Sequence, residues 1–132
     1  MTSKVVYIGE LRTESTHIQS GNIIVSDAPT DNNGKGEAFS PTDTVANALA
    51  TCMFTIMGIK ARDMDVDMEG STAEVTKVMQ SDPRMIAKIE VVFNMKAAAN
   101  DKTRTILERA ALTCPVYLSL HPDIKKEITF NW

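Results

Sequence analysis

The stretch PTDTVANALATCMFTIMGIKA, residues 41–61, is apolar on almost every side when it is placed on a helical wheel. Cys52 lies at its middle, on the same face as Leu49 and Ile56. That face also carries Val45, Ala48 and Ile59, and a narrow stripe of Asn47, Thr51, Thr55 and Gly58 runs beside it. A helix without a broad polar face needs cover on most sides. One small domain has few residues with which to cover such a helix, so we expect a second subunit to contribute to its cover.

The residues before this helix carry the signals of a helix start. Ser40 is expected at the N-cap, and Pro41 suits the first helical position. Asp43 falls where the acid of a capping box would lie. The sequence therefore predicts a helix over residues 41–61.

Length and composition predict one domain spanning residues 1–132. The chain is 43% hydrophobic and 23% charged, with a net charge of −3. No basic patch indicates nucleic acid or a membrane surface as a partner. Polar residues interrupt the apolar segment 45–59, so we expect no membrane span.

The two cysteines and the N-terminus indicate a reducing compartment. The first residues, MTSKVVYIGE, contain no long apolar run of the kind that a signal peptide carries. No Cys-x-x-Cys pair, His/Cys cluster or phosphate-binding glycine pattern is present. We therefore expect a cytoplasmic protein with no permanent structural disulfide, no metal and no bound nucleotide.

The remaining elements predict an α+β fold in which helices pack on antiparallel sheet. Strands are expected over residues 4–12 and on both sides of the Ser20-Gly21-Asn22 turn, followed by a loop at residues 28–38. After the central helix come two strands within 64–80 and 84–98, a helix over 101–112, a short helix from Pro115 and a final strand over 125–132.

The two cysteines occupy different local settings. Cys52 is surrounded by apolar residues, where an inert packing role is the ordinary one. Cys114 directly precedes Pro115, at a helix start where free N–H groups and the helix dipole favour a thiolate. The residues alone thus predict that Cys114 is the more acidic thiol, with a packing role as the alternative.

Two segments resemble the OsmC/Ohr family of osmotically inducible and organic-hydroperoxide-resistance proteins. FSPTDTVANALATCM, residues 39–53, looks like the family's Pro-acid-x-x-x-x-Ala-x-x-x-Cys helix. LTCPVYLSL, residues 112–120, looks like its Cys-Pro segment, with Cys114 lying 62 positions after Cys52. The N-terminal strands and the Gly-rich loop complete the order, and residues 20–43 look closest to an OsmC-like branch of the family.

The resemblance implies both a fold and a chemistry. The implied fold is an intertwined homodimer with two long central helices and sheet wrapped around them. The implied activity is that of a thiol-dependent peroxidase in oxidative-stress defence. Cys52 would attack an organic hydroperoxide and become a sulfenic acid, and Cys114 would then condense with it to a disulfide. No bound cofactor is implied, but an external dithiol reductant such as a lipoyl protein or thioredoxin is needed to restore both thiols.

The resemblance also implies an arginine near the attacking sulfur, itself held by a carboxylate. Arg12 matches the family's N-terminal arginine in sequence order, and Arg62 and Arg104 are alternatives without motif support. A fixed guanidinium favours a thiolate against the cost of burial.

The supporting carboxylate is where this chain departs from the family pattern. The family's acid directly follows the proline, a position that Thr42 occupies here. Asp43, one step on, is the candidate catalytic acid, although the capping box also accounts for it and an ideal helix puts it opposite Cys52. Glu37 and His17 are alternative partners for the arginine.

Two further functions stay open at this point. The first is a non-peroxidatic OsmC-like protein that binds a small molecule in an apolar cavity, in which some of the eight methionines would form an adaptable lining. The second is a redox sensor that uses the same cysteines without fast turnover.

Overall fold

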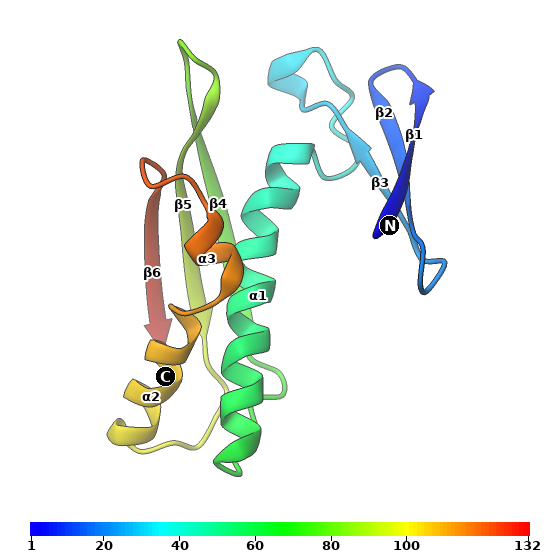
Figure 1. Cartoon of the computed structure of the whole chain (residues 1–132). Coiled ribbons are helices and arrows are strands. Elements are labelled where there is room, and N and C mark those ends of the chain that lie inside the picture. The colour runs from blue at the N-terminus through cyan, green and yellow to red at the C-terminus, as the bar shows by residue number, and fades with distance from the viewer. The chain divides into compact units, whose positions relative to one another are not determined.

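The computed structural model describes all 132 residues (Figure 1). The elements follow the order β1 (Ser3–Gly9), β2 (Arg12–His17), β3 (Ile23–Asp27), η1 (Thr30–Asn32), α1 (Pro41–Asp63), β4 (Thr72–Gln80), β5 (Met85–Asn94), α2 (Asp101–Ala111), α3 (Pro115–Ser119) and β6 (Lys125–Asn131). They form two compact units, residues 1–45 and 46–132, with the boundary inside the first turns of α1. The α+β class predicted from the sequence is confirmed.

The first unit is an antiparallel sheet in the order β1-β2-β3. The single strand predicted over residues 4–12 was wrong, because the chain turns at Glu10 and Leu11 between β1 and β2. Both residues have positive φ, 52° and 62°, as the two central residues of a tight type I′ hairpin turn require. Neither is the Asn or Gly that usually marks such a turn, so no residue type at these positions predicts it.

Apolar side chains are exposed on both faces of this sheet. Alternation along the strands places Val5 and Ile24 on one face, and Val6 and Val25 on the other. All four side chains are exposed. In the whole first unit only Asp27 and Ser40 are buried, so residues 1–45 contain no buried apolar core of their own.

The second unit contains a sheet in the order β4-β5-β6. Strands β4 and β5 are antiparallel, but β6 runs parallel to β5, which corrects the prediction of a wholly antiparallel sheet. The chain reaches β6 only after α2 and α3, and such a helical crossover is the connection that a parallel pair needs.

The three helices of the second unit lie on one face of this sheet (Figure 1). The core between them contains buried residues from α1, β5 and α2, together with Cys114. The ring of Phe93 stacks on Phe130 and meets Phe54 edge-on, with ring centroids 5.1 and 4.8 Å apart. On the opposite face, Lys88 pairs with Glu90 and Glu127.

Helix α1 is buried on one face only within this chain. Its buried residues are Ala46, Leu49, Ala50, Met53, Met57 and Ala61. On the neighbouring apolar face Val45 and Ile59 are exposed, and Cys52 is half-buried. The helix predicted from the sequence is confirmed and ends two residues later than expected.

Helix α1 passes a length and hydropathy test for a membrane span, although the polar residues within it led us to expect none. The helix has 23 residues, and an 18-residue window in it reaches a mean hydropathy of 1.3, which suffices by length and composition. One such helix is weak evidence for a membrane span, because the core helix of a soluble protein passes the same test.

Candidate functional site

The two cysteines are brought together in the second unit. Cys52 lies in the middle of α1, and Cys114 is the N-cap of α3, as its position before Pro115 predicted. Cys52 is half-buried and Cys114 is fully buried, and both are free thiols. The Cys52 side chain lies close enough to Cys114 to raise the pKa of the Cys114 thiol. The chain thus places two thiols, 62 residues apart in sequence, side by side.

The surroundings of Cys114 make its thiol a weak acid. Burial raises the pKa of Cys114, and the neighbouring Cys52 side chain raises it further. The N–H of Tyr117 donates to Cys114 Sγ at 3.2 Å. This hydrogen bond lowers the pKa of Cys114, but by less than burial raises it. The prediction that its helix-start position would make Cys114 an acidic thiol was therefore wrong, because burial outweighs the N–H groups at the start of α3.

Arg12, the predicted arginine, lies in the first unit within a tight cluster of carboxylates. It begins β2 and faces Asp27 at the end of β3, its partner in the strand register. Arg12 Nε and Nη2 donate to the two Asp27 oxygens at 2.7 and 2.8 Å, and Nη2 also donates to Glu37 Oε2 at 2.9 Å. These bonds hold the pKa of Asp27 below its ordinary value and raise the pKa of Arg12 above its own.

The sequence predicts Glu37 as an alternative partner of Arg12, but it does not reveal Asp27. The Asp27 side chain is 2% exposed and also accepts the backbone N–H of Glu37 at 3.1 Å. Its link to Arg12 follows from the strand register. That register could be predicted only after recognising the Glu10-Leu11 turn.

Asp43 takes part in the cap at the start of α1. Its carboxylate accepts the N–H of Ser40 at 2.9 Å, and its own N–H donates to Ser40 Oγ at 3.0 Å. This reciprocal pair is the predicted capping box. The carboxylates that hold Arg12 are instead Asp27 and Glu37. A catalytic role for Asp43 therefore stays a prediction that this geometry does not favour.

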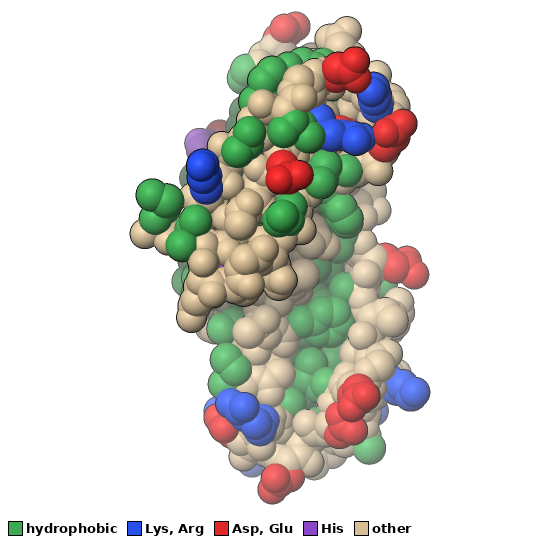
Figure 2. Space-filling model, turned by 90° about the vertical axis from the view of Figure 1, so that its right-hand side faces the viewer, with side chains coloured by type: hydrophobic (Ala, Val, Ile, Leu, Met, Phe, Trp, Pro, Cys, Tyr) green, Lys and Arg blue, Asp and Glu red, His purple; other side chains and the backbone are tan.

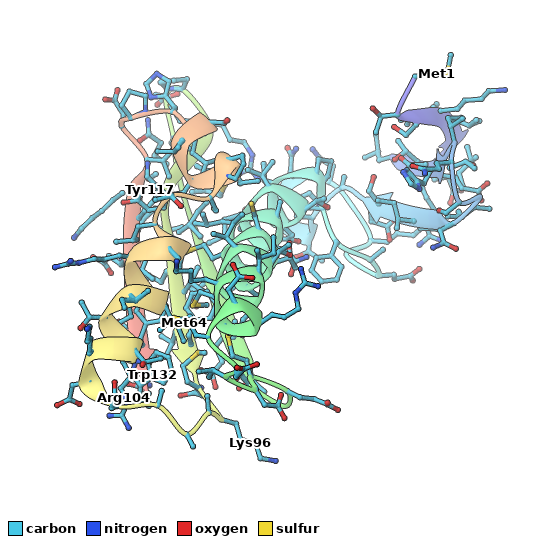
Figure 3. All side chains as sticks on the ribbon, turned by 60° about the horizontal axis from the view of Figure 1, so that its bottom comes forward. Met1, Met64, Lys96, Arg104, Tyr117 and Trp132 are labelled. Carbon is cyan, nitrogen blue, oxygen red and sulfur yellow. The ribbon has the colours of Figure 1, made fainter.

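The other polar candidates lie in separate places. His17 Nδ1 is 2.7 Å from Ser20 Oγ in the turn after β2, and Arg12 has its own partners. Arg104 lies over the Trp132 ring at 5.6 Å (Figure 3), where Trp132 Nε1 donates to Glu108 at 2.8 Å. Arg104 thus helps to fasten the C-terminus onto α2.

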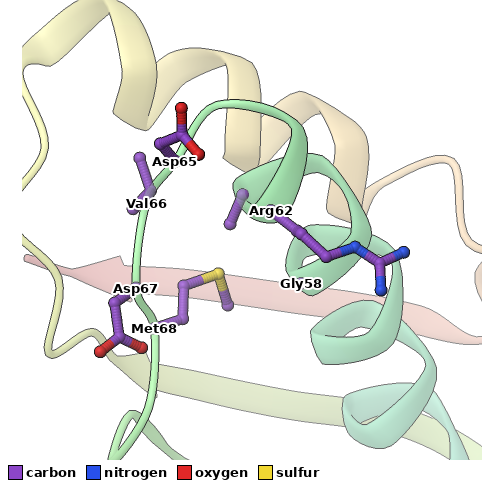
Figure 4. Close-up of a pocket in the computed structure, with 7 residues that line it drawn as sticks. Gly58, Arg62, Asp65, Val66, Asp67 and Met68 are labelled. Carbon is purple, nitrogen blue, oxygen red and sulfur yellow. The ribbon is translucent and has the colours of Figure 1, made fainter.

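Arg62 lines a cavity of about 470 Å³ at the C-terminal end of α1 (Figure 4). Asp65 and Asp67 are the other charged residues of its lining. Their charged groups and that of Arg62 point to different sides rather than toward a common point. Convergent polar groups are typical of a ligand site, so this cavity is a poor candidate. The chain also has no group of three His, Cys, Asp or Glu side chains that could hold a metal ion.

Comparison with known proteins identifies the family. A family model described as OsmC-like protein matches residues 34–129, which include both cysteines. The chain belongs to the OsmC-like family. No curated protein matches it. A crystal structure from Psychrobacter arcticus 273-4 is 54% identical, covers 99% of this chain and 96% of its own, and superposes with a TM-score of 0.96. That protein is provisionally described as an osmotic stress induced and detoxification response protein.

More distant OsmC-like structures share the fold. An OsmC organic hydroperoxide resistance protein from Legionella pneumophila is 13% identical, covers 100% of this chain and 98% of its own, and has a TM-score of 0.73. An organic hydroperoxide resistance protein from Elizabethkingia anophelis, also 13% identical, covers 99% and 96% with a TM-score of 0.72. At these identities the likeness shows the OsmC-like fold alone.

Proposed function

We propose that this OsmC-like protein is a thiol-dependent peroxidase that reduces organic hydroperoxides. The observation that carries the proposal is the pair of free, interacting thiols of Cys52 and Cys114. Cys52 is the more accessible of the two, whereas Cys114 is buried and its pKa is raised. A nucleophile must meet its substrate as a thiolate, so this difference favours Cys52 as the attacking sulfur and Cys114 as the resolving one.

The reaction has two chemical steps, which are followed by reduction of the disulfide. The Cys52 thiolate attacks one oxygen of the hydroperoxide O–O bond, which breaks and releases the alcohol after protonation. Cys52 is then a sulfenic acid, oxidised by two electrons. The Cys114 sulfur attacks the Cys52 sulfur, the disulfide forms, and the hydroxyl leaves as water. An external dithiol then reduces this disulfide by thiol–disulfide exchange, becomes oxidised itself and restores both thiols.

The surroundings of the thiols support an organic substrate. Cys114 belongs to the hydrophobic core, which also contains Met53 and Phe93, and Cys52 packs against that core. Apolar walls favour a hydroperoxide with an organic group over hydrogen peroxide. The relatives from Legionella and Elizabethkingia carry the description of organic hydroperoxide resistance, which agrees with this substrate class.

The resemblance to the OsmC/Ohr family assigns Arg12 to the Cys52 thiolate, and this role stays a prediction. A planar guanidinium held by carboxylates is a fixed charge, and it loses little freedom when an anion forms beside it. Asp27 and Glu37 provide this support in place of the family's acid after the proline. We further propose that the enzyme works as a homodimer in the cytoplasm, in oxidative-stress defence, with a lipoyl protein or thioredoxin as the dithiol.

The test is turnover of cumene hydroperoxide by the reduced protein, with hydrogen peroxide as the comparison substrate. Wild type should oxidise two thiols per chain and form a Cys52–Cys114 disulfide, located by non-reducing peptide mapping. Cys52→Ser should abolish peroxide consumption. Cys114→Ser should still react once, and Cys52 should then trap dimedone as a sulfenic acid and over-oxidise more readily. If wild type and Cys52→Ser consume peroxide equally slowly, the proposal fails.

A second candidate is a small-molecule-binding protein without peroxidase activity. A cavity of about 400 Å³ in the first unit favours it, because hydroxyl groups of Thr13, Ser15 and Ser26 line it beside Val5 and Ile24. Such a mixture of apolar and polar groups suits a small organic ligand. An inert wild type would favour this function, and a slow, reversible disulfide without turnover would favour a redox sensor.

A further inference from the structure

We propose that Tyr117 is a positioning residue for the resolving sulfur, and that Lys126 holds Tyr117 in place from β6. The pair keeps the Cys114 sulfur aimed at Cys52 during the second chemical step. This proposal rests on the proposed function, because it concerns the step that forms the disulfide. Every residue in it belongs to the second unit, residues 46–132.

The first observation is a lysine on the core-facing side of β6. Lys126 lies opposite Ile89 in the parallel pair, and Ile89 is fully buried in the core. The next residues of β6 on this face are Ile128 and Phe130, and both pack against the core. The preceding residue, Lys125, points to the opposite face and is exposed. A half-buried lysine among apolar side chains needs partners for its ammonium group.

Two contacts account for the position of Lys126. Its Nζ donates to the carbonyl oxygen of Ile124 at 3.1 Å. The same Nζ lies 5.3 Å from the centroid of the Tyr117 ring, which projects from α3 toward β6 (Figure 3). A cation over the face of an aromatic ring is attracted by its π electrons, and more strongly where the pair is shielded from water. Lys126 therefore joins β6 to α3 through Tyr117.

Tyr117 is also the residue that holds the Cys114 sulfur. Its backbone N–H donates to Cys114 Sγ, which is the bond of an N-cap side chain to the third residue of its helix. The N–H of Leu118 donates to the Cys114 carbonyl oxygen at 3.2 Å. The first turn of α3 therefore sets the direction of Cys114 Sγ. Because Cys52 belongs to α1, a displacement of this turn moves one sulfur relative to the other.

Helix α3 is too short to hold this turn in place by itself. It has five residues, none of them buried, and isolated helices shorter than about 12 residues are marginal in water. Contacts with the rest of the second unit must therefore fix it. Val116 and Tyr117 pack against the core, whereas Leu118 is 69% exposed. The contact of Tyr117 with Lys126 thus attaches α3 to the sheet.

Formation of the disulfide is the step that depends on this attachment. Cys114 Sγ attacks the Cys52 sulfur, the S–S bond forms as the S–O bond breaks, and the hydroxyl leaves as water with the Cys114 proton. The rate of such an intramolecular step depends on the orientation of the two sulfurs. Attack of Cys52 on the hydroperoxide does not involve Cys114. A looser α3 should therefore slow the second step alone and give a second hydroperoxide more time to convert Cys52 to a sulfinic acid.

The experiment compares variants at both ends of the contact. Tyr117→Leu replaces the ring by an aliphatic side chain, and Tyr117→Phe restores a ring without the hydroxyl group. Lys126→Met removes the charge but keeps a long, flexible side chain, and Lys126→Arg restores a cation. Lys125→Met is the matched control, because Lys125 is the adjacent lysine, is exposed and pairs with Glu127.

The readout is the competition between disulfide formation and over-oxidation in a single turnover. Each reduced variant is mixed with increasing cumene hydroperoxide, and mass spectrometry gives the over-oxidation midpoint, the concentration at which half of Cys52 is sulfinic acid rather than disulfide. Tyr117→Leu and Lys126→Met should each lower this midpoint about 3- to 30-fold, the fold-change that corresponds to a partly shielded cation–π contact. Tyr117→Phe, Lys126→Arg and Lys125→Met should stay within about twofold of wild type, because the contact remains. The rate of Cys52 oxidation should change less than about twofold in every variant, because Cys114 takes no part in that step.

A double-mutant cycle tests whether the two residues act through one contact. Lys126→Met should lower the over-oxidation midpoint less than about twofold further in a Tyr117→Leu background, because residues in contact are not additive. Full additivity overturns the proposal, as does a wild-type midpoint in both single variants or an equal slowing of both chemical steps. If Tyr117→Leu does not fold, equal midpoints for Lys126→Met and Lys125→Met overturn it. A wild type that consumes no hydroperoxide would instead be a failure of the proposed peroxidase function.

Discussion

The difference between the two thiols is decided by a few atoms around each sulfur. Cys114 Sγ accepts the N–H of Tyr117 at the start of a helix of only five residues, and its side chain is fully buried. The charged form of a thiol loses its hydration on burial, and the N–H groups at the start of α3 do not replace it. The neighbouring Cys52 side chain adds to the effect and raises the pKa of Cys114 further.

This difference predicts the order of alkylation in the reduced protein. Iodoacetamide should label Cys52 before Cys114 at pH 7 to 8, since Cys114 is buried and its pKa is raised. Labelling of Cys114 should accelerate only at higher pH. Cys52→Ser should lower the pKa of Cys114 but leave it raised, because burial is the larger cause. Mass spectrometry of each cysteine peptide over time measures this, with urea-unfolded protein as the control for equal intrinsic reactivity. Faster labelling of Cys114 in the folded protein would contradict the order.

The Arg12 cluster shows how far a sequence predicts a site at the residue scale. The motif order selected Arg12, and the loop composition made Glu37 a candidate. Asp27 was missed because its role depends on lying opposite Arg12 in the register of β2 and β3. An error of one residue in that register would turn Asp27 to the other face of the sheet, so only a known turn geometry identifies it.

At the scale of elements, local signals predicted α1 well because they lie within four consecutive residues. Ser40 and Asp43 form the expected capping box around Pro41, and the helix begins where the sequence indicated. The parallel pairing of β5 with β6 had no such signal. The orientation of β6 depends on the end of the sheet at which the chain arrives after α2 and α3. The sequence pattern of each strand alone is compatible with parallel and with antiparallel pairing.

The capping box gives a stability prediction for α1. Ser40→Ala removes the oxygen that accepts the Asp43 N–H, and the Ser40 side chain is buried where water does not replace it. We expect a loss of about 1 kcal/mol in the free energy of unfolding, within the range of 0.5–2 kcal/mol known for such caps. Thr105→Ala, at an exposed position of α2, is the control and should change it by less than about 0.5 kcal/mol. Urea unfolding at one protein concentration compares them. Equal midpoints for both variants would show that the cap adds nothing.

At the scale of the molecule, the two units differ in what they can bury alone. The second unit has a continuous core, whereas the first has no buried apolar side chain at all. Hydrophobic side chains lie at the surface among a few charged ones on the face drawn in Figure 2. Soluble proteins rarely leave extended apolar surface uncovered, and a sheet with apolar side chains on both faces needs cover on both. The exposed face of α1 has the same requirement.

A homodimer meets these requirements, because a second copy supplies the same apolar helix face and the same sheet. We therefore predict a stable dimer with α1 at the subunit interface. Ala48→Asp or Ile56→Asp places a charge on the Cys52 face of α1, and an unpaired buried charge costs several kcal/mol. Either variant should yield monomer or unfolded chain, whereas Thr105→Asp on the exposed side of α2 should remain dimeric. Size-exclusion chromatography with light scattering measures the mass. A folded wild-type monomer of 14.5 kDa at micromolar concentration would contradict the prediction.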